Sequence, residues 1–305
     1  MTINQKELRL GLIGMSEGNG HPFSWSAICN GYDPTAIQDC EFPAIATYLG
    51  QQKWPAARMS GVTVSHVWTQ DRKVSRRIAD AGLINRVVNE PSDMLGEVDA
   101  LLLARDDAEN HMQFARPFLE ADLPVYVDKP VALTEVGFDT LLSFCSRPSQ
   151  IYSCSALRFS QELCLTDSDI LHIGEVRQVI GITPKSWQKY AIHLIDPVFI
   201  GLQITDGVSV RGVLELGGDG RILIAQVDQG PELIFIASGS EAATNPIEIR
   251  YIGSRGSVRK VFSDTFSAFK AALQAFVVQV RTGHEHTPIQ TLRPMVRVLE
   301  AGLYP

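Results

Sequence analysis

A glycine-rich segment near the N-terminus has the composition of a loop that binds phosphate groups. It covers residues 14–21, between an apolar run at 8–13 that predicts a strand and a helix expected to begin near Ser24. The N–H groups of such a loop, together with the N-terminus of the next helix, bind the pyrophosphate of a dinucleotide. Two glycines of the G-x-G-x-x-G pattern are replaced, and a structural turn is the alternative. The residues expected to contact the cofactor are Gly14, Ser16, Glu17, Gly18 and Asn19.

The same loop also fits the chemistry of a serine nucleophile. Residues 14–18 satisfy G-x-S-x-G, the turn that presents the catalytic serine of many hydrolases. That turn needs a helix directly after it, whereas Gly20, His21 and Pro22 intervene here. Such a serine also does not normally follow the first strand of the sheet. A serine hydrolase acting through Ser16 is therefore a remote alternative.

Further cofactor contacts are expected after the next predicted strand, at 61–68. A dinucleotide-binding domain usually carries an acidic residue there, which binds the adenosine ribose. Thr69 occupies that position, and Asp71 and Arg72 follow it. A hydroxyl followed by an arginine suits a ribose 2′-phosphate as well as a free hydroxyl, so NAD and NADP both remain possible. An ordinary solvated turn is the alternative interpretation.

A charged pair follows a predicted buried strand at 124–127. Asp128 and Lys129 stand where that strand ends, and Pro130 comes next. In open parallel sheets, ligands bind in the crevice at the carboxyl ends of the strands. The proline removes an N–H group and restricts Lys129 to extended backbone geometry. We therefore expect Asp128 and Lys129 to face a bound ligand.

The order of the predicted elements indicates a fold in which the ends of these strands lie close together. Strands at 8–13, 61–68, 98–103, 124–127 and 151–156 alternate with helices at 71–81, 111–120 and 134–144. This alternation is typical of a Rossmann-like, doubly wound parallel sheet with helices on both faces. An aromatic insertion at 30–60 is expected to cover part of the cleft.

The second half of the chain has a different pattern. Its β-rich runs lie at 176–182, 208–216, 221–227, 233–238 and 247–252, separated by turns that contain glycine and proline. They predict a mostly antiparallel open sheet that grows by hairpins, followed by a helix with one apolar face. We expect an α/β protein with a dinucleotide-binding Rossmann domain at 1–150. An α+β domain for substrate binding and oligomerisation is expected at 151–305.

Composition excludes several classes of protein. The 305 residues carry a formal net charge of −7, and 45% of them are hydrophobic. There is no basic stripe for nucleic acid, and no apolar run approaches the ~18 residues that span a bilayer. The polar N-terminus lacks the apolar stretch of a signal peptide. Five cysteines form no C-x-x-C pair, and His284-x-His286 lacks a third ligand, so no metal site is expected. We expect a soluble, cytoplasmic protein that binds neither nucleic acid nor membrane.

Several motifs occur in the order found in one enzyme family. Asp128-Lys129-Pro130 resembles its E-K-P motif, and residues 98–102 resemble its fourth-strand motif. Residues 173–176 resemble the "iGev" that starts its second domain, and 192–196 resemble the "gxHxxD" of its catalytic helix. Residues 266–283 and 291–302 resemble its closing helices. Nearly the whole chain thus resembles the Gfo/Idh/MocA family of NAD(P)-dependent oxidoreductases, which includes glucose–fructose oxidoreductase and inositol dehydrogenase.

This resemblance implies roles for three residues. The family lysine lies beside the nicotinamide and the sugar hydroxyl, and Lys129 matches it. The family histidine handles the proton, and His193 matches it. The family aspartate four residues before that histidine is replaced here by Lys189, which puts the activity in question. If Lys129 and Lys189 face one cleft, two ammonium groups favour an anionic substrate, such as a carboxylated or nucleotide-linked sugar.

Three more residues are candidates for substrate contact. Arg158 follows the last strand of the first domain, and a plain salt bridge is an equal alternative for it. Trp187 lies near the catalytic helix, although packing in the core is the more common fate of tryptophan. Tyr190 stands where the family often has an apolar residue.

The function expected from the sequence is an NAD(P)-dependent oxidoreductase. Its substrate would be a sugar, a polyol or a sugar derivative, and its cofactor NAD or NADP. A regulatory relative that holds the dinucleotide without turnover is one alternative. An NAD-dependent glycosidase, which the family also contains, is another. By analogy with the family, we expect a homodimer or homotetramer.

Overall fold

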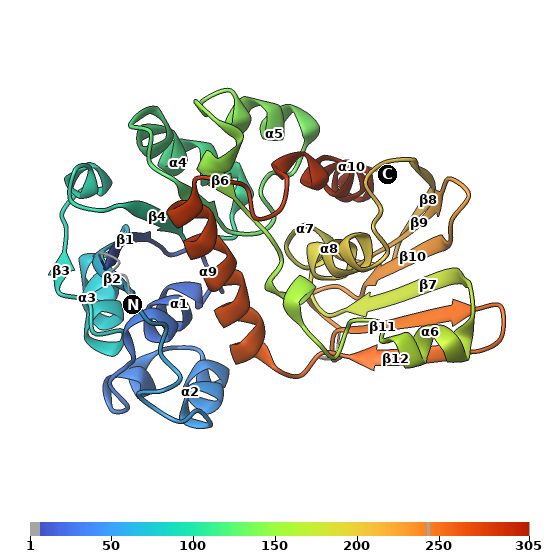
Figure 1. Ribbon diagram of the computed structural model, residues 1–305, viewed down its shortest axis with the longest axis horizontal. Coiled ribbons are helices and arrows are strands. Elements are labelled where there is room, and N and C mark those ends of the chain that lie inside the picture. The colour runs from blue at the N-terminus through green and yellow to red at the C-terminus, as the bar shows by residue number, and fades with distance from the viewer. Residues whose placement is uncertain (1–6, 243–244, 305) are drawn as a thin grey trace, which may run out of the picture. The chain divides into compact units, whose positions relative to one another are not determined.

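Two six-stranded sheets organise the chain. The computed structural model describes residues 7–242 and 245–304 and divides into two units (Figure 1). Unit 1 contains the described residues up to Val131, together with 139–153 and 269–289. Unit 2 contains 132–138, 154–268 and the described residues from Gln290 onward.

The sheet of unit 1 is parallel throughout and has the strand order β3-β2-β1-β4-β5-β6. Its strands are β1 (Leu8–Ile13), β2 (Val62–Trp68), β3 (Arg86–Val87), β4 (Ala100–Leu103), β5 (Val125–Val127) and β6 (Ile151–Tyr152). Strands β4 and β5 are buried at every position, as strands covered on both faces are. The predicted Rossmann-like sheet is confirmed. The winding direction changes between β1 and β4, which makes their carboxyl ends the topological switch point.

Helices α1 (His21–Asn30), α3 (Arg72–Ala81), α4 (His111–Glu120) and α5 (Glu135–Leu142) follow these strands. The prediction for the start of α1 is wrong, because the helix begins at His21 and Ser24 lies buried inside it. Gly20 is the N-cap residue of α1, and the Asn19 side chain before it accepts the His21 N–H at 2.8 Å, while Pro22 suits the first turn. The effect is to bring the histidine to the end of the glycine loop.

Helix α9 (Thr265–Thr282) covers the same face of the unit 1 sheet as α1. The Tyr126 ring of β5 contacts both Trp25 of α1 and Phe276 of α9, with centroids 4.6 and 5.5 Å apart. Gln279 donates to the carbonyl oxygens of Ser149 and Ile151. Because of these contacts, unit 1 takes in residues 269–289, whereas the sequence predicted two contiguous domains.

The insertion at 30–60 forms a short 3-10 helix η1 (Ala36–Asp39) and helix α2 (Pro43–Gly50). Both pack in the layer of α1 and α3. A Cβ atom on Gly20 would lie 2.6 Å from Ile45 and 2.8 Å from Phe42. The insertion therefore packs directly against the end of the glycine loop, and this close contact favours glycine at position 20.

The sheet of unit 2 has the order β12-β11-β7-β10-β9-β8. Its strands are β7 (Val176–Thr183), β8 (Val208–Glu215), β9 (Arg221–Val227), β10 (Glu232–Ala237), β11 (Glu248–Gly253) and β12 (Ser257–Val261). The mostly antiparallel open sheet is confirmed. Consecutive strands β8, β9 and β10 pair as the predicted hairpins, and β11 pairs with β12 in the same way. The exception is β7, which lies between β10 and β11 and pairs with β10 in parallel. The sequence prediction also missed β12.

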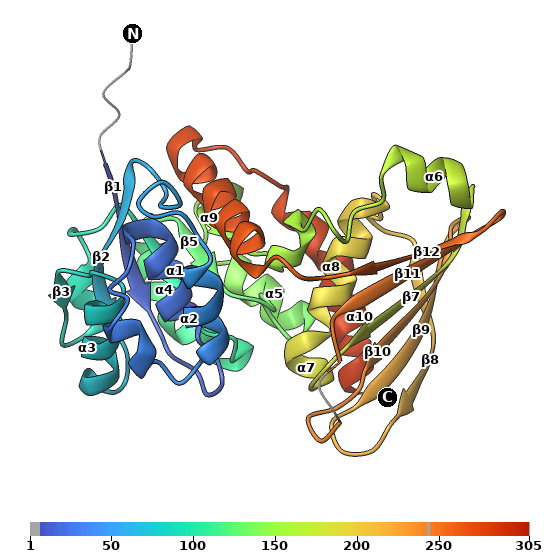
Figure 2. The same cartoon turned by 90° about the horizontal axis from the view of Figure 1, so that it is seen from below.

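Helices cover one face of this second sheet. Figure 2 shows α7 (Trp187–Tyr190), α8 (Ile192–Gly201) and α10 (Leu292–Leu303) on that face, and α6 (Asp167–Ile173) at one end of the sheet. The opposite face carries two rows of partly exposed isoleucines, aligned by the strand register. The rows are Ile180–Ile234–Ile224 and Ile182–Ile236–Ile222.

The connections include the remaining 3-10 helices. They are η2 (Pro91–Met94), η3 (Ala108–Asn110), η4 (Pro148–Gln150), η5 (Ala156–Phe159) and η6 (Ile289–Thr291). Among the described residues, no helix is long and apolar enough to cross a bilayer.

Glu162 links two segments of unit 2, and the pKa of its carboxyl group predicts that stability depends on pH. Its carboxylate accepts hydrogen bonds from Ser160, Ser263 and the Asp264 N–H. Burial opposes ionisation, but these hydrogen bonds prevail and lower the pKa of Glu162 from 4.5 to about 2. Because the folded-state pKa is lowered, the stabilisation is present above pH 4.5 and is lost as the pH falls toward 2.

Glu162→Gln should therefore lower the melting temperature at neutral pH and lose less stability than wild type between neutral pH and about pH 3. Glu175→Gln is the control, because its ion pair with Arg177 is exposed on the surface. Equal acid sensitivity of wild type and Glu162→Gln would contradict the assignment.

Candidate active site

The glycine loop lies at the switch point of unit 1, between the carboxyl end of β1 and the start of α1. A Cβ atom on Gly14 would lie 2.5 Å from the Pro22 ring, so the close approach of strand and helix requires glycine. Gly18 has a φ of +75°, in the left-handed region. Within the described part of the chain, the N–H groups of Gly18 and Gly20 have no protein acceptor. Glu17 and Gly18 are exposed, which leaves this stretch of the loop accessible to a ligand.

Ser16 is tied to the end of β4 through Asp106. Its hydroxyl donates to Oδ1 of Asp106 at 2.7 Å and accepts the Asp106 N–H at 3.1 Å. Oδ2 of the same carboxylate lies 3.6 Å from Nζ of Lys129. All three side chains are buried. Asp106 therefore joins the glycine loop to the lysine at the end of β5.

This geometry does not suit a serine nucleophile. A nucleophilic serine needs an accessible hydroxyl and a neighbouring base such as histidine, and Ser16 is buried with its hydroxyl directed at a carboxylate. Among the described residues, no histidine ring hydrogen-bonds to that hydroxyl. The contacts of Ser16 favour a structural role in the loop.

Ser16→Gly should lower the free energy of unfolding by about 1–3 kcal/mol, because the buried Asp106 carboxylate loses a hydrogen-bond donor. Denaturant unfolding of the two proteins measures the change. In parallel, wild type should resist labelling by an organophosphate, and covalent labelling of Ser16 would restore the hydrolase interpretation.

Asp128 binds the other half of the loop. Its Oδ2 accepts from Nδ2 of Asn19 at 2.9 Å and lies 2.5 Å from Nδ1 of His21. Its Oδ1 accepts the N–H of Lys129 at 2.8 Å. Asp128 is 1% exposed, so it contributes to the site by holding the loop and the lysine backbone in place.

The residues after β2 take structural positions. The Thr69 hydroxyl, which is buried, donates to the Asp71 carbonyl oxygen and contacts Oγ of Ser75. Asp71 caps α3 by accepting the Lys73 N–H at 2.8 Å. Arg72 is exposed and hydrogen-bonds to Asn89. Asp71 and Arg72 are both exposed, whereas Thr69 is buried.

Gln70, which the sequence prediction did not select, contacts the glycine loop instead. Its side chain pairs with the backbone of Met15, accepting from the N–H at 3.3 Å and donating to the carbonyl oxygen at 2.6 Å. Arg105 also donates to Gln70 and to the Met15 carbonyl oxygen, at 3.0 and 3.3 Å. Asp107 pairs with that guanidinium. The start of the loop is therefore fixed from the ends of both β2 and β4.

In unit 2, His193 belongs to a hydrogen-bonded group at the start of α8. Its Nδ1 lies 2.8 Å from Oγ of Ser155. The Ser155 N–H donates to Asp196 at 2.7 Å, and Asp196 forms a two-bond ion pair with Arg158 at 2.7 and 2.8 Å. His193 is 7% exposed. This arrangement orients its ring and gives Arg158 the salt-bridge role that was the alternative to substrate contact.

The neighbouring candidates have different surroundings. Tyr190 packs edge-on to His193, with ring centroids 5.2 Å apart, and accepts a hydrogen bond from Lys185 at 2.8 Å. Lys189 is half-buried. The helix is interrupted at Ala191, so Lys189 lies on α7 and His193 on α8. Trp187 is 1% exposed and donates to the Leu299 carbonyl oxygen, as a packed core tryptophan does.

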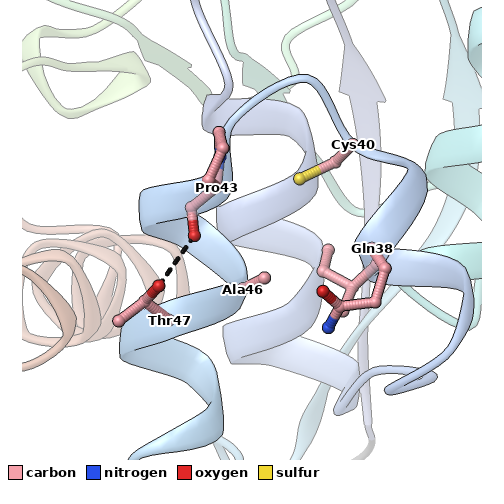
Figure 3. Close-up of a pocket in the computed structure, with 6 residues that line it drawn as sticks. Gln38, Cys40, Pro43, Ala46 and Thr47 are labelled. Atoms are coloured by element: carbon pink, nitrogen blue, oxygen red, sulfur yellow. Dashed lines mark hydrogen bonds between the residues drawn. The ribbon is translucent and has the colours of Figure 1, made fainter.

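The 30–60 insertion contains a pocket of its own. It has a volume of about 410 Å³ and is lined by Ile37, Gln38, Cys40, Pro43, Ala46 and Thr47. Figure 3 shows the Thr47 hydroxyl turned back to the Pro43 carbonyl oxygen, at 2.9 Å. Burial raises the pKa of the Cys40 thiol, which makes it a poor nucleophile. Nothing in this lining supplies acid–base chemistry.

The described residues include no cluster of three or more His, Cys, Asp or Glu side chains arranged to hold a metal ion. In unit 1, the candidate functional groups are Lys129, the buried carboxylates of Asp106 and Asp128, and the glycine loop. In unit 2, the candidate is the oriented ring of His193. Such groups can bind a phosphate-containing ligand and move a proton.

Comparison with known sequences gives no match. No protein-family model matches the chain, and no curated protein matches it either.

Comparison with solved structures shows the fold. Myo-inositol 2-dehydrogenase from Lactobacillus plantarum matches with a TM-score of 0.70 and 17% identity, over 98% of this chain and 96% of that one. Myo-inositol dehydrogenase from Corynebacterium glutamicum matches with a TM-score of 0.70 and 13% identity, over 97% and 95%. Scyllo-inositol dehydrogenase from Lactobacillus casei, solved with bound NAD(H) and scyllo-inositol, matches with a TM-score of 0.67 and 13% identity, over 97% of both chains.

Proposed function

We propose that this protein is an NAD(P)-dependent oxidoreductase that acts on a polyol or sugar, and that it belongs to the Gfo/Idh/MocA family. The observation that carries the proposal is the cluster at the switch point of unit 1. There Asp106 and Asp128 connect a glycine loop, exposed at Glu17 and Gly18, to a buried lysine at the end of β5. The fold shared with inositol dehydrogenases is consistent with it.

The residues of unit 1 fit a dinucleotide. The N–H groups of Gly18 and Gly20 would hold its pyrophosphate, with Ser16 and Asn19 keeping the loop in shape through Asp106 and Asp128. Arg72 would approach the adenosine ribose, and its charge leaves both NAD and NADP as candidates. When bound, the nicotinamide ring supplies hydride transfer.

The chain's own residues supply binding and proton transfer. In unit 1, Lys129 would donate a hydrogen bond to the hydroxyl that is oxidised. In unit 2, His193 is the candidate for proton transfer. Ser155 fixes the orientation of the His193 ring by its contact with Nδ1, and an imidazole can accept a proton near neutral pH. Unit 1 would thus serve the cofactor and unit 2 the substrate.

A neutral polyol is the substrate class that we favour. The case for an anionic substrate depended on the combined charge of Lys129 and Lys189. In the structure, Asp106 lies 3.6 Å from the Lys129 ammonium and offsets its charge. An anionic sugar derivative is then the second class to test.

The isoleucine rows on the open face of the second sheet support a homodimer or homotetramer. Half-exposed apolar side chains in register on three strands form a continuous surface, of the kind that pairing between subunits buries. Light scattering of the purified protein tests this part, and Ile234→Lys should shift an oligomer toward the monomer.

The central experiment separates binding from turnover. Fluorescence titration with NADH and NADPH should show saturable binding, and oxidation of myo-inositol, scyllo-inositol or related polyols should produce the reduced cofactor. Binding without turnover of any polyol or anionic sugar would favour a regulatory protein. Release of a leaving group from aryl glycosides, with no net cofactor reduction, would favour the glycosidase. Absence of dinucleotide binding would reject the proposal.

A further inference from the structure

His21 lies where the glycine loop meets α1, and contacts on three sides fix its ring. Nδ1 lies 2.5 Å from Oδ2 of Asp128. The ring stacks on Trp25 of α1, with centroids 5.2 Å apart and an interplanar angle of 13°. Its edge meets Phe269 of α9, with centroids 5.0 Å apart. The imidazole is therefore held in one orientation.

The contact with Asp128 determines which nitrogen faces outward. An ionised carboxylate only accepts hydrogen bonds, so Nδ1 of His21 carries the hydrogen in this contact. Nε2 has no hydrogen-bond partner among the described residues, and the side chain is 16% exposed. Asp128, which is 1% exposed and also bound by Asn19, is fixed in turn.

His111 shows what a structural histidine looks like in the same unit. It is 1% exposed, and both of its nitrogens lie near backbone carbonyl oxygens, at 3.2 and 2.7 Å. His21 differs on both counts, because one nitrogen stays open and the side chain keeps some exposure. Packing alone therefore does not account for His21.

The charges around the loop indicate a role for Nε2 of His21. Asp106 and Asp128 are buried carboxylates at this edge of the sheet, and His21 is in contact with Asp128. Glu17 is an exposed carboxylate on the loop. A pyrophosphate brings further negative charge, and burying it beside the Asp128 carboxylate is unfavourable. A protonated His21 would balance Asp128 and present Nε2–H to a phosphate oxygen.

We propose that His21 is a phosphate ligand of the dinucleotide site, and that binding of the dinucleotide is linked to protonation of His21. The proposal rests on the proposed function and deepens it by making cofactor affinity depend on pH. The charged group in contact with the ring is Asp128, from the end of β5. The other elements packed on the ring contribute the uncharged Trp25 and Phe269. Affinity is highest where the imidazole is protonated and falls as the pH rises.

The test measures the Kd of NADH and NADPH across about pH 5 to 9, the range over which an imidazole changes charge. The Kd should rise with pH, by as much as about tenfold per pH unit for one linked proton. Calorimetry in buffers of different ionisation enthalpy should show proton uptake on binding. His21→Gln, whose amide can still donate to Asp128, should bind more weakly than wild type at acidic pH, with a Kd that no longer depends on pH. His284→Gln, which alters an exposed histidine, should keep the wild-type dependence.

The outcomes separate this proposal from the function on which it rests. A wild-type Kd that is independent of pH would overturn the role of His21 and leave the dinucleotide site standing. The same holds for a His21→Gln variant that keeps the wild-type pH dependence. Failure of wild type to bind either nucleotide at any pH would overturn the proposed function itself. If His21→Gln does not fold, nitrogen-15 NMR of wild-type histidines decides, because bound nucleotide should shift the His21 nitrogens toward the imidazolium form.

Discussion

Lys129→Met should lower kcat for polyol oxidation by about 10²- to 10³-fold, because the oxygen of the hydroxyl that is oxidised loses the hydrogen bond donated by the ammonium. The side chain is 5% exposed and lies 3.6 Å from Asp106, so methionine fills a similar space but neither donates a hydrogen bond nor carries charge. Affinity for NADH should change much less, because the loop N–H groups and Asp128 remain. Steady-state kinetics and fluorescence titration measure the two effects separately.

Two further variants identify what Lys129 supplies. Lys129→Arg keeps the positive charge but does not release a proton at ordinary pH, so recovery of turnover in this variant would show that charge alone is needed. Lys53→Met removes an exposed lysine of the insertion and should leave kcat unchanged. Wild-type turnover by Lys129→Met would remove the lysine from the mechanism.

Asp196→Asn should lower the free energy of unfolding by about 3–5 kcal/mol, because a buried guanidinium loses the carboxylate that balances it. The side chains of Arg158 and Asp196 are 3% and 1% exposed, so water compensates little. Asp206→Asn is the matched control, since Asp206 is 80% exposed in its pair with Arg297 and should cost under about 1 kcal/mol. Urea unfolding followed by circular dichroism measures both.

A double variant tests the reason for this loss. Replacing Arg158 and Asp196 together by Met and Leu should restore much of the stability lost in Asp196→Asn, because no buried charge is then left. A double variant as unstable as the sum of the single ones would show that the loss comes from packing rather than charge. Activity should stay low in the double variant, since Asp196 also holds the Ser155 backbone beside His193.

The positions of the strands in unit 1 could be read from the sequence because their signals are local. Apolar runs, turn residues and helix caps such as Asp71 act within a few residues of one another. The same locality explains the errors. Ser24 looked like a helix cap, but the helix begins at His21, whose N–H bonds to the Asn19 side chain. Asn19 is held in turn by Asp128, far along the chain. The parallel pairing of β7 with β10 likewise leaves no local signal, because register depends on the partner strand.

By itself, the sequence determined the strand–glycine loop–helix order and placed Asp128 and Lys129 at the end of a buried strand. The tertiary structure decided which side chains those residues meet. Ser16 and Asp106 are 90 residues apart, His21 and Asp128 are 107 apart, and Arg158 and Asp196 are 38 apart. These pairs form because the strand order 3-2-1-4-5-6 brings the carboxyl ends of β1, β4 and β5 to one edge, and because η5 packs on α8. Spacing along the chain does not encode such neighbours, since they depend on how whole elements bury their apolar faces.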